Sequence, residues 1–269
     1  MRIDIKGLKL VNIDINLNIQ ENKKLGVFSN DKNLVITFLE LVSGINKNHN
    51  TIFANDINVF DNKVYFENRI YFDFKNRYLT TLRVKKIHEV LKSYNLEFNS
   101  DKFIEICKEL NVRGETDISY KYEFTKTGNT FVNLAMLCSV ERKNIIINNP
   151  TINLNLDSDI EYFKKKLTSH EFNTVILGLN NVSHFKNSLD QIVLFSDFGS
   201  MYVVDNNDSL IVFDSNIDKH FLIKDKLFKG KYFIALNTYT KEDLKNFQKM
   251  KVKYEIINVY DFDKYLGDE

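Results

Sequence analysis

Two asparagines, Asn148 and Asn149, stand at the place in this sequence where chemistry is most expected. They follow Ile145–Ile147, an apolar β-branched run that predicts a strand buried on both faces, and they precede Pro150, the only proline in the chain. Proline ends a strand because it lacks the N–H that the ladder needs. Ligands of α/β proteins bind at the carboxyl ends of such strands. A site for a metal ion and a phosphate would normally present two acidic side chains there, whereas both side chains here are neutral amides.

The composition describes an ordinary folded chain with no sign of a nucleic-acid partner. Lys and Arg number 37 against 36 Asp and Glu, so there is no basic excess to neutralise phosphates. Cys107 and Cys138 lie in apolar segments and predict buried thiols of a reducing compartment, not a disulfide or metal pair. The chain shows neither a signal peptide nor an apolar stretch long enough to span a membrane, so we expect an intracellular protein without a membrane span.

The elements that would position the two asparagines follow from the periodicity. Residues 2–19 alternate apolar and polar side chains, which predicts two antiparallel strands with one buried face. A buried helix is expected at Leu34–Val42, with Gly44 as a left-handed residue just past its end. Further strands are predicted at Leu25–Ser29, Thr51–Phe53, Val64–Phe66, Ile70–Phe72, Thr174–Leu179, Gln191–Phe195 and Ser200–Val204.

Helical patterns fill the middle of the chain. They cover Val84–Ser93, Ser100–Leu110 with Ser100 as N-cap, Thr127–Val140, Asp157–Thr168 and a short piece at Asn181–Asn187. In the tail, the helix Lys241–Met250, capped by Thr240, separates the strands Tyr232–Ala235 and Val252–Val259. Strands alternating with helices predict a mostly parallel sheet. The all-helical stretch at about 77–140 interrupts that alternation and indicates an inserted subdomain.

In order and in local sequence, these elements resemble the ATP-binding subunits of ABC transporters over residues 2–205. The matching segments are Gly26–Thr37 (phosphate loop), Phe38–Gly44 (following helix), Leu134–Thr151 (signature helix into the acidic strand), Asn153–Asn155 (D-loop), Thr174–Ser183 (switch strand and turn) and Asp197–Ser200 (late hairpin). The resemblance implies a P-loop NTPase-like ABC ATPase fold of the α/β class. This fold has a mostly parallel core sheet, an antiparallel β subdomain and an inserted helical subdomain. We expect an ABC ATPase-like domain at 1–208 and a small C-terminal α/β extension at 209–269.

The aligned phosphate loop lacks the residues that bind phosphate. Such a loop needs glycines that turn backbone N–H groups toward the phosphates, a lysine, and a hydroxyl for Mg²⁺. The glycine positions hold Ser29, Lys32 and Leu34, the lysine position holds Val35, and the hydroxyl position holds Ile36. Thr37, one place later, keeps a hydroxyl. Asn30 and the negatively charged Asp31 are the other degenerate positions of the loop. Lys32 is a possible substitute cation, although it stands three places early.

The other aligned motifs are degenerate as well. Asn148 replaces the acid that positions Mg²⁺, and Asn149, which cannot accept a proton near neutral pH, replaces the catalytic base. Asn180 stands at the switch histidine, with His184 close by as a surface or packing residue. Thr125 and Lys126 stand in the signature loop without its glycines and could still reach an anion. The γ-phosphate-sensing glutamine falls near Asp73 or Phe74, and no aromatic residue precedes Phe28 to stack an adenine.

These losses act on interactions that work as a unit, so we expect negligible hydrolysis, no metal site, and neither ATP nor Mg²⁺ as a cofactor. The resemblance implies a degenerate subunit, peripheral at the inner face of the cell membrane. It would pair with a membrane permease, with a second ABC ATP-binding subunit, or with itself. The alternatives are a weak ATPase that completes a partner's site through Thr125 and Lys126, and a soluble interaction or immunity protein. Docking on a permease would use Asp73–Leu82 and Val84–Ser93, with Phe74 and Tyr78 as candidate aromatic anchors.

Overall fold

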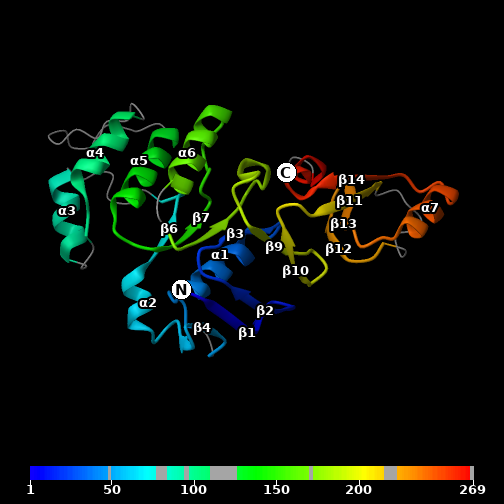
Figure 1. Ribbon diagram of the computed structural model, residues 1–269, viewed down its shortest axis with the longest axis horizontal. Helices are drawn as coiled ribbons and strands as arrows, with labels where there is room; N and C mark the ends of the chain where they lie inside the picture. Colours follow the sequence, from blue (N-terminus) through cyan, green and yellow to red (C-terminus); the bar gives the residue numbers. More distant parts are fainter. Residues whose placement is uncertain are drawn as a thin grey trace.

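The computed structural model describes residues 1–47, 50–76, 84–93, 97–109, 126–169, 172–214 and 223–266. Within them the strands form three sheets, with most of the helices gathered beside the central one (Figure 1). The mixed α/β fold expected from the sequence, with a parallel central sheet, antiparallel sheets and helices inserted between two central strands, is confirmed.

The central sheet carries the strands whose ends matter for function. Its order is β10-β9-β3-β8-β7-β6, and every neighbouring pair is parallel except β9 and β10. The strands are β3 (Lys24–Ser29), β6 (Arg69–Asp73), β7 (Asn144–Asn148), β8 (Thr174–Gly178), β9 (Gln191–Phe195) and β10 (Met201–Asp205). All five residues of β7 and of β8 are buried, as expected for strands covered on both faces.

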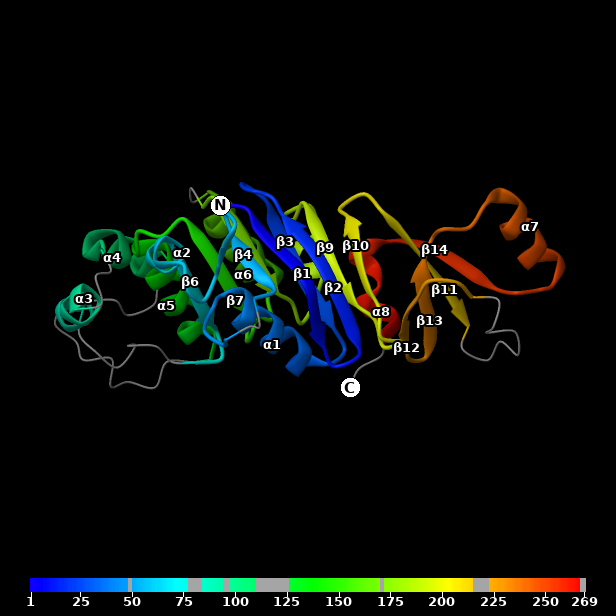
Figure 2. The same cartoon turned by 90° about the horizontal axis from the view of Figure 1, so that it is seen from below.

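Alternate residues of the central strands face two different hydrophobic cores. Ile146 and Ile176 pack with helix α1 (Lys32–Val42) and the N-terminal sheet. Ile145 and Ile147 face the opposite side, toward α5 (Lys126–Ser139), α6 (Asp157–Ser169) and the C-terminal residues. Helix α1 therefore lies between the central and N-terminal sheets (Figure 1), and its end is followed by Gly44 at φ +72° as expected. Figure 2 looks onto the N-terminal sheet, with β1 and β2 in front.

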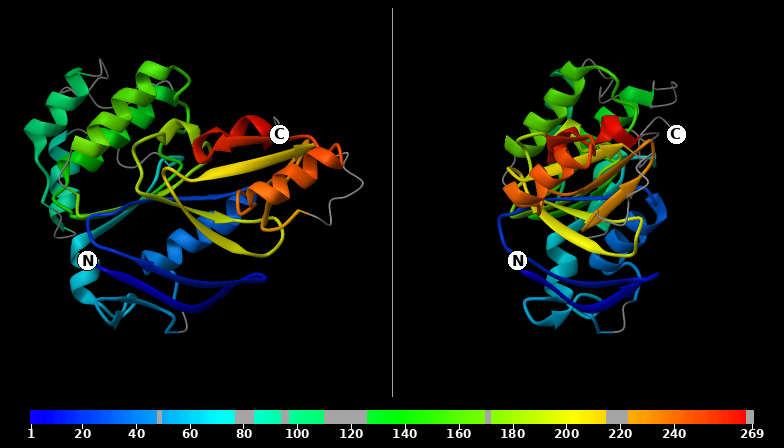
Figure 3. Two further views of the ribbon diagram at one scale, coloured as in Figure 1. Left: turned by 45° about the vertical axis from the view of Figure 1, so that its right-hand side comes forward. Right: turned by 90° about the vertical axis from the view of Figure 1, so that its right-hand side faces the viewer.

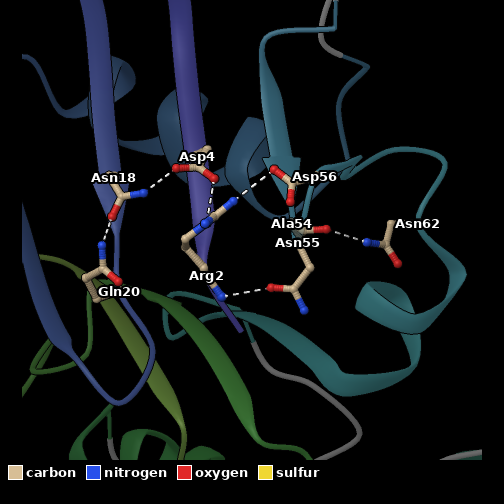
Figure 4. A network of polar contacts seen from close by, with 8 residues as sticks. All are labelled: Arg2, Asp4, Asn18, Gln20, Ala54, Asn55, Asp56 and Asn62. Carbon is tan, nitrogen blue, oxygen red and sulfur yellow. Dashed lines mark hydrogen bonds and ion pairs between the residues drawn. The ribbon is translucent and has the colours of Figure 1, made fainter.

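The N-terminal sheet is antiparallel and pinned by a polar network. It has the order β2-β1-β4-β5, formed by β1 (Ile3–Leu10), β2 (Ile13–Ile19), β4 (Ile52–Ala54) and β5 (Ile57–Asn58). The Arg2 guanidinium forms ion pairs with Asp4 at 2.7 Å and with Asp56 at 2.8 Å. The Arg2 backbone N–H donates to Asn55 Oδ1, and Asn62 Nδ2 donates to Ala54 O (Figure 4). These contacts fix the β4–β5 turn against the start of β1.

Among the described residues between β6 and β7, three helices lie at the expected position of the helical subdomain. They are α3 (Val84–Ser93), α4 (Ser100–Glu109) and α5. Helix α4 is capped by Asn99, whose Oδ1 accepts from Lys102 N at 2.9 Å, so the prediction of Ser100 as N-cap is wrong. Cys107 and Cys138 are free and buried, as predicted, and burial raises their thiol pKa values to about 12 and about 11.

Residues after 208 build a sheet of their own. Its strands are β11 (Ser209–Asp214), β12 (Lys226–Lys229), β13 (Tyr232–Leu236) and β14 (Tyr254–Asn258), with α7 (Lys241–Lys249), η3 (Val259–Asp261) and α8 (Asp263–Leu266). The order is β12-β13-β11-β14 and every pairing is antiparallel, so the alternation of strands and helices does not produce parallel pairs here. The predicted Thr240 cap of α7 is confirmed, as part of a capping box with Asp243.

Three further expectations need correction. Residues Lys63–Asn68 form helix α2, capped by Asn62, so the strand predicted at Val64–Phe66 is wrong. The helix expected at Asn181–Asn187 is the single 3-10 turn η1 (Ser183–Phe185). Phe74 is not an exposed anchor, because it is 2% exposed and packs against Phe72 and Phe163. Tyr78 lies outside the described residues, as does most of the predicted docking segment Asp73–Leu82. In the described part of the chain, no helix has the length and apolar character of a membrane span.

Candidate functional site

The connection between β3 and α1 is only two residues long. Strand β3 ends at Ser29 and helix α1 starts at Lys32, so only Asn30 and Asp31 lie between them. The segment that sequence comparison aligned with a phosphate loop is therefore helical from Lys32 to Thr37. A loop able to wrap around phosphate oxygens does not form here, because its residues are committed to the first turns of α1.

Asp31 caps the helix that follows. Its Oδ1 accepts from Asn33 N at 2.9 Å and from Leu34 N at 3.4 Å, and its own N–H donates to Ser29 Oγ at 3.2 Å. A helix N-terminus attracts anions through its free N–H groups and its dipole. In this chain the Asp31 carboxylate already occupies that position.

The side chains at the aligned lysine and hydroxyl positions face inward or sideways. Val35 is 4% exposed and belongs to the core between α1 and the sheets. Ile36 is half-buried beside the ends of β7 and β8, and Thr37 is exposed on the helix surface. Lys32 is exposed at the first helical position, nearest to the strand ends. A lysine placed at position 35 would be buried in the apolar core and would not meet a ligand at the surface.

Asn148 is 2% exposed and is held by two neighbouring elements. Its Nδ2 donates to Asp73 Oδ2 at 3.1 Å, across the parallel pair of β6 and β7. Its Oδ1 lies so close to Gly178 that a Cβ at that glycine would be 2.9 Å away. The amide thus donates to the end of β6 and packs closely against Gly178 of β8, a structural role that no local sequence pattern indicates.

Asn149 has a backbone reason for its residue type. It adopts φ +51°, a left-handed conformation that asparagine tolerates better than most residues. Its N–H donates to Gly178 O at 3.0 Å, and its carbonyl accepts from Ile152 N at 3.2 Å, which closes the turn around Pro150. This turn aims the chain away from the sheet immediately after β7.

The switch-histidine position, Asn180, is exposed in the loop after β8. The next residue, Asn181, accepts from both the N–H and the hydroxyl of Ser183, at 3.0 and 2.6 Å. His184 Nδ1 lies 3.0 Å from Thr151 Oγ1, so it joins the turn after β7 to η1. Burial lowers the His184 pKa, which favours the neutral imidazole in this packing role.

The signature-loop positions are described only in part. Thr125 lies outside the described residues, and Lys126 is the exposed first residue of α5. The next turn of α5 is tied to the turn after β7. Thr127 Oγ1 donates to Asn153 O at 2.8 Å, and Thr130 Oγ1 donates to Ile152 O at 2.7 Å. The aligned signature helix and D-loop therefore contact each other within one chain.

Two hollows lie at the strand ends among the described residues, and the larger one is lined in part by residues of the C-terminal extension. The first, of about 10 Å³, lies among Lys32, Val35, Asn148, Asn149 and Asn180, and it has room for about one water molecule. The second, of about 430 Å³, is lined partly by the core and partly by the C-terminal residues. Its lining residues are Phe28, Ser29, Asn30, Lys32, Asn180, Asn181, Lys229, Gly230, Asp263 and Leu266.

Two aspartates close to these hollows were missed from the sequence. Asp197, in the β9–β10 turn, accepts from Asn30 Nδ2 at 3.0 Å and from Lys229 N at 2.9 Å. Asp263, at the start of α8, accepts from Ser183 N at 2.8 Å. The Asp-Phe-Gly turn signal identified the loop that carries Asp197 but not its partners. No local pattern marked Asp263.

The residues present do not fit magnesium ATP. The amides at the start of α1 are satisfied by Asp31, the aligned lysine position is a buried valine, and the aligned acid positions are amides with structural partners. No group of three or more acidic, histidine or cysteine side chains that could hold a metal ion occurs among the described residues. The arrangement can hold its own loops in place, and we derive no chemical step from it.

No protein-family model matches this chain, and no curated protein sequence matches it. Solved structures do. The cassette MJ0796, described as a dimeric bacterial ABC transporter cassette, matches with a TM-score of 0.60 at 14% identity over 76% of this chain and 99% of that chain. cbiO1 from Clostridium perfringens, part of the ABC transporter complex cbiONQ, matches with a TM-score of 0.58 at 13% identity over 76% and 88%. A putative cobalt transport ATP-binding protein, cbiO-2, matches with a TM-score of 0.59 at 14% identity over 89% and 93%. The chain therefore has the fold of ABC transporter ATP-binding subunits.

Proposed function

We propose that this chain is a catalytically degenerate ABC-type subunit that serves as a structural or regulatory partner. Its partners would be a membrane permease, an active ATP-binding subunit, or a second copy of itself. It would be cytoplasmic and peripheral at the inner face of the cell membrane. Residues 1–208 would form the ABC ATPase-like domain and residues 209–269 a C-terminal extension. The fold supports the family-like role, and the site chemistry supports the loss of catalysis.

The single observation that carries the proposal is the Asp31 cap. A phosphate group approaching the start of α1 would meet a carboxylate that already accepts from Asn33 N and Leu34 N. Binding there would require the phosphate to displace Asp31 and to overcome repulsion between like charges. The only nearby cation that alignment offers, Lys32, is a solvated residue at the first helical position.

The elements that give the fold its shape are kept, in contrast to the site. Val27, Phe38, Leu134 and Ile146 are all buried in the two cores that flank the central sheet. Retention of these cores without the phosphate chemistry favours a role in assembly, because an assembly role needs the surface of the fold and not its active site.

A nucleotide titration tests the catalytic half of this proposal. We expect purified protein to show no saturable binding of a fluorescent ATP analogue with Mg²⁺ up to millimolar concentration, and no ATP hydrolysis above buffer. The matched variant is Lys32→Ala, which removes the candidate cation at the first position of α1. Micromolar binding by the wild type that is lost in Lys32→Ala would contradict the proposal and support a weak ATP-binding subunit.

A co-purification experiment tests the assembly half. Tagged protein purified from detergent-solubilised membranes should retain a multi-span membrane protein or a second ABC ATP-binding subunit, and tag alone should retain neither. If the protein purifies entirely from the soluble fraction, without either class of partner, the proposed transporter role is wrong. Recovery of only a soluble partner would support the interaction or immunity hypothesis.

A further inference from the structure

The C-terminal residues reach over the strand ends of the central sheet. The cavity of about 430 Å³ has Ser29, Asn30 and Asn180 on one side and Lys229 and Asp263 on the other. Figure 3 shows α8 and η3, in red, beside the loop that carries η1, and the two 3-10 turns are in contact. The part of the core that corresponds to a ligand-binding edge is therefore faced by the chain's own extension.

Asp263 is the main polar link between the extension and the loop after β8. Its Oδ2 accepts from the backbone N–H of Ser183 at 2.8 Å. The same N–H also donates to Asn181 Oδ1 at 3.0 Å, so the start of η1 is held both by its own loop and by the extension. Nearby, Lys186 Nζ lies 3.8 Å from Asp261, which adds only a long, partly exposed ion pair.

Asp197 makes a second polar link. It accepts from Asn30 Nδ2, on the β3–α1 connection, and from the backbone N–H of Lys229 on β12, while its own N–H donates to Leu227 O at 2.9 Å. The β9–β10 turn thus links the β3–α1 connection to strand β12 of the C-terminal sheet.

An aromatic cluster lies directly beneath these links. Phe28, from β3, packs edge to face against Phe228 at 5.4 Å and Phe262 at 5.0 Å, and the latter two stack at 5.3 Å. All three rings are buried. The Phe28 ring of β3 is thus buried by aromatic side chains of the extension. The extension is therefore packed against the central sheet and is not only tethered to it by the chain.

We propose that residues 223–266 are a built-in cover of the strand ends, latched by Asp263, which shields the β3–α1 connection and holds the loop after β8 in one conformation. This inference deepens the proposed function and rests on it, because a cover over this edge suits a subunit that does not exchange nucleotide. The test uses no nucleotide. It can therefore contradict the latch without contradicting the proposed loss of ATP binding, and the nucleotide titration can do the reverse.

Thiol labelling at Ser29 reports directly on the cover. Ser29 lines the cavity and is 6% exposed, so Ser29→Cys places a probe beneath the cover. The native Cys107 and Cys138 are buried and give little background. In the Asp263→Ala background, maleimide labelling of position 29 at neutral pH should accelerate about tenfold, from the loss of the hydrogen bond that Ser183 N donates to a charged acceptor.

Two matched variants separate the latch from general damage. Asp263→Asn keeps an oxygen that can accept from Ser183 N and should label no faster than the wild type. Asp261→Ala removes the ion pairs to Lys186 and Lys264 but leaves the amide acceptor, and it should also label at the wild-type rate. Equal labelling of position 29 with and without Asp263→Ala, or equal acceleration by Asp261→Ala, would overturn the proposal.

Mass spectrometry of the labelled protein shows whether the variant has unfolded. Modification of position 29 alone indicates local opening, whereas modification of Cys107 and Cys138 as well indicates global unfolding. In that case hydrogen exchange of the wild type decides the matter. The Ser183 amide should be protected as strongly as the amides of β8, and rapid exchange of this amide would refute the latch.

Discussion

Replacing Asp31 with alanine isolates the contact that most distinguishes this chain from a phosphate-binding protein. The change removes the acceptor for Asn33 N at 2.9 Å and for Leu34 N at 3.4 Å and leaves both amides at the start of α1 without that partner. Only the shorter contact has the length of a normal hydrogen bond. We therefore expect a loss in the free energy of unfolding of about 1 kcal/mol from the cap, with roughly 0.3–1 kcal/mol more from the charge at the helix terminus.

Chemical and thermal unfolding measure this loss. For a chain of this size, about 1 kcal/mol corresponds to a melting temperature lower by roughly 2–4 °C. Asp31→Asn keeps the capping oxygen and should lose less than half as much. Asp14→Ala is the matched control for a surface acid, because Asp14 makes only a 3.7 Å ion pair with Lys9 on the exposed face of the N-terminal sheet.

A comparison of the wild type with Asp31→Ala also tests whether Asp31 excludes anions. Phosphate, compared with chloride at equal ionic strength, should raise the melting temperature of Asp31→Ala more than that of the wild type, because only the variant removes the carboxylate that accepts from Asn33 N. If Asp31→Ala is as stable as the wild type, or if phosphate stabilises both equally, Asp31 is not the group that fills this position. The reasoning behind the proposed function would then fail with it.

Three further predictions concern packing, protonation and capping. Gly178→Ala should destabilise the protein by about 1–3 kcal/mol, because its new methyl would lie 2.6 Å from Leu39 Cδ1 and 2.9 Å from Asn148 Oδ1. In a double-mutant cycle, Gly178→Ala should cost less stability in the Leu39→Ala background than in the wild type. Strictly additive losses would contradict the clash. Burial raises the Asp263 pKa from 3.8 to about 6, so the stability of the wild type relative to Asp263→Asn should be highest below pH 4 and should fall as the pH rises through about 6. That fall should be at most about 3 kcal/mol, and a difference independent of pH in urea titrations would show that the carboxyl is not perturbed. Thr240→Ala should lower the free energy of unfolding by about 1 kcal/mol, because the α7 capping box is lost. Thr240→Ser should retain most of that free energy. Unchanged hydrogen exchange at the start of α7 in Thr240→Ala would contradict the role of the cap.

Local sequence patterns predicted the elements that are buried on a regular period. The alternation in residues 2–19 became the antiparallel pair β1 and β2, and the isoleucine run became the fully buried β7. Where the apolar run is only a few residues long, the predicted strand was wrong. Val64–Phe66 resembles a strand, but Asn62 caps a helix there and Tyr65 is drawn into the core, where its hydroxyl donates to Val42 O at 2.8 Å.

The site shows a similar division. An aspartate immediately before an apolar helical pattern is an N-cap signal, so the role of Asp31 was readable from the sequence, although alignment with a phosphate loop drew attention to its charge instead. The neutrality of Asn148 and Asn149 was also readable. Their structural tasks were not, because the bond to Asp73 and the φ of +51° at Asn149 depend on how β6, β7 and β8 lie side by side.

The sequence by itself determined that this chain has an α/β core and that the positions aligned with the lysine and the two acids carry uncharged side chains, because burial and side-chain charge are properties of local residue types. The tertiary structure alone decided what stands in their place. Asp263 reaches Ser183 across 80 residues, and Asn30 reaches Asp197 across 167. No periodic pattern connects residues so far apart. Their meeting depends on the packing of the antiparallel C-terminal sheet against Phe28, and that packing places the chain's own carboxylates at the strand ends of the central sheet.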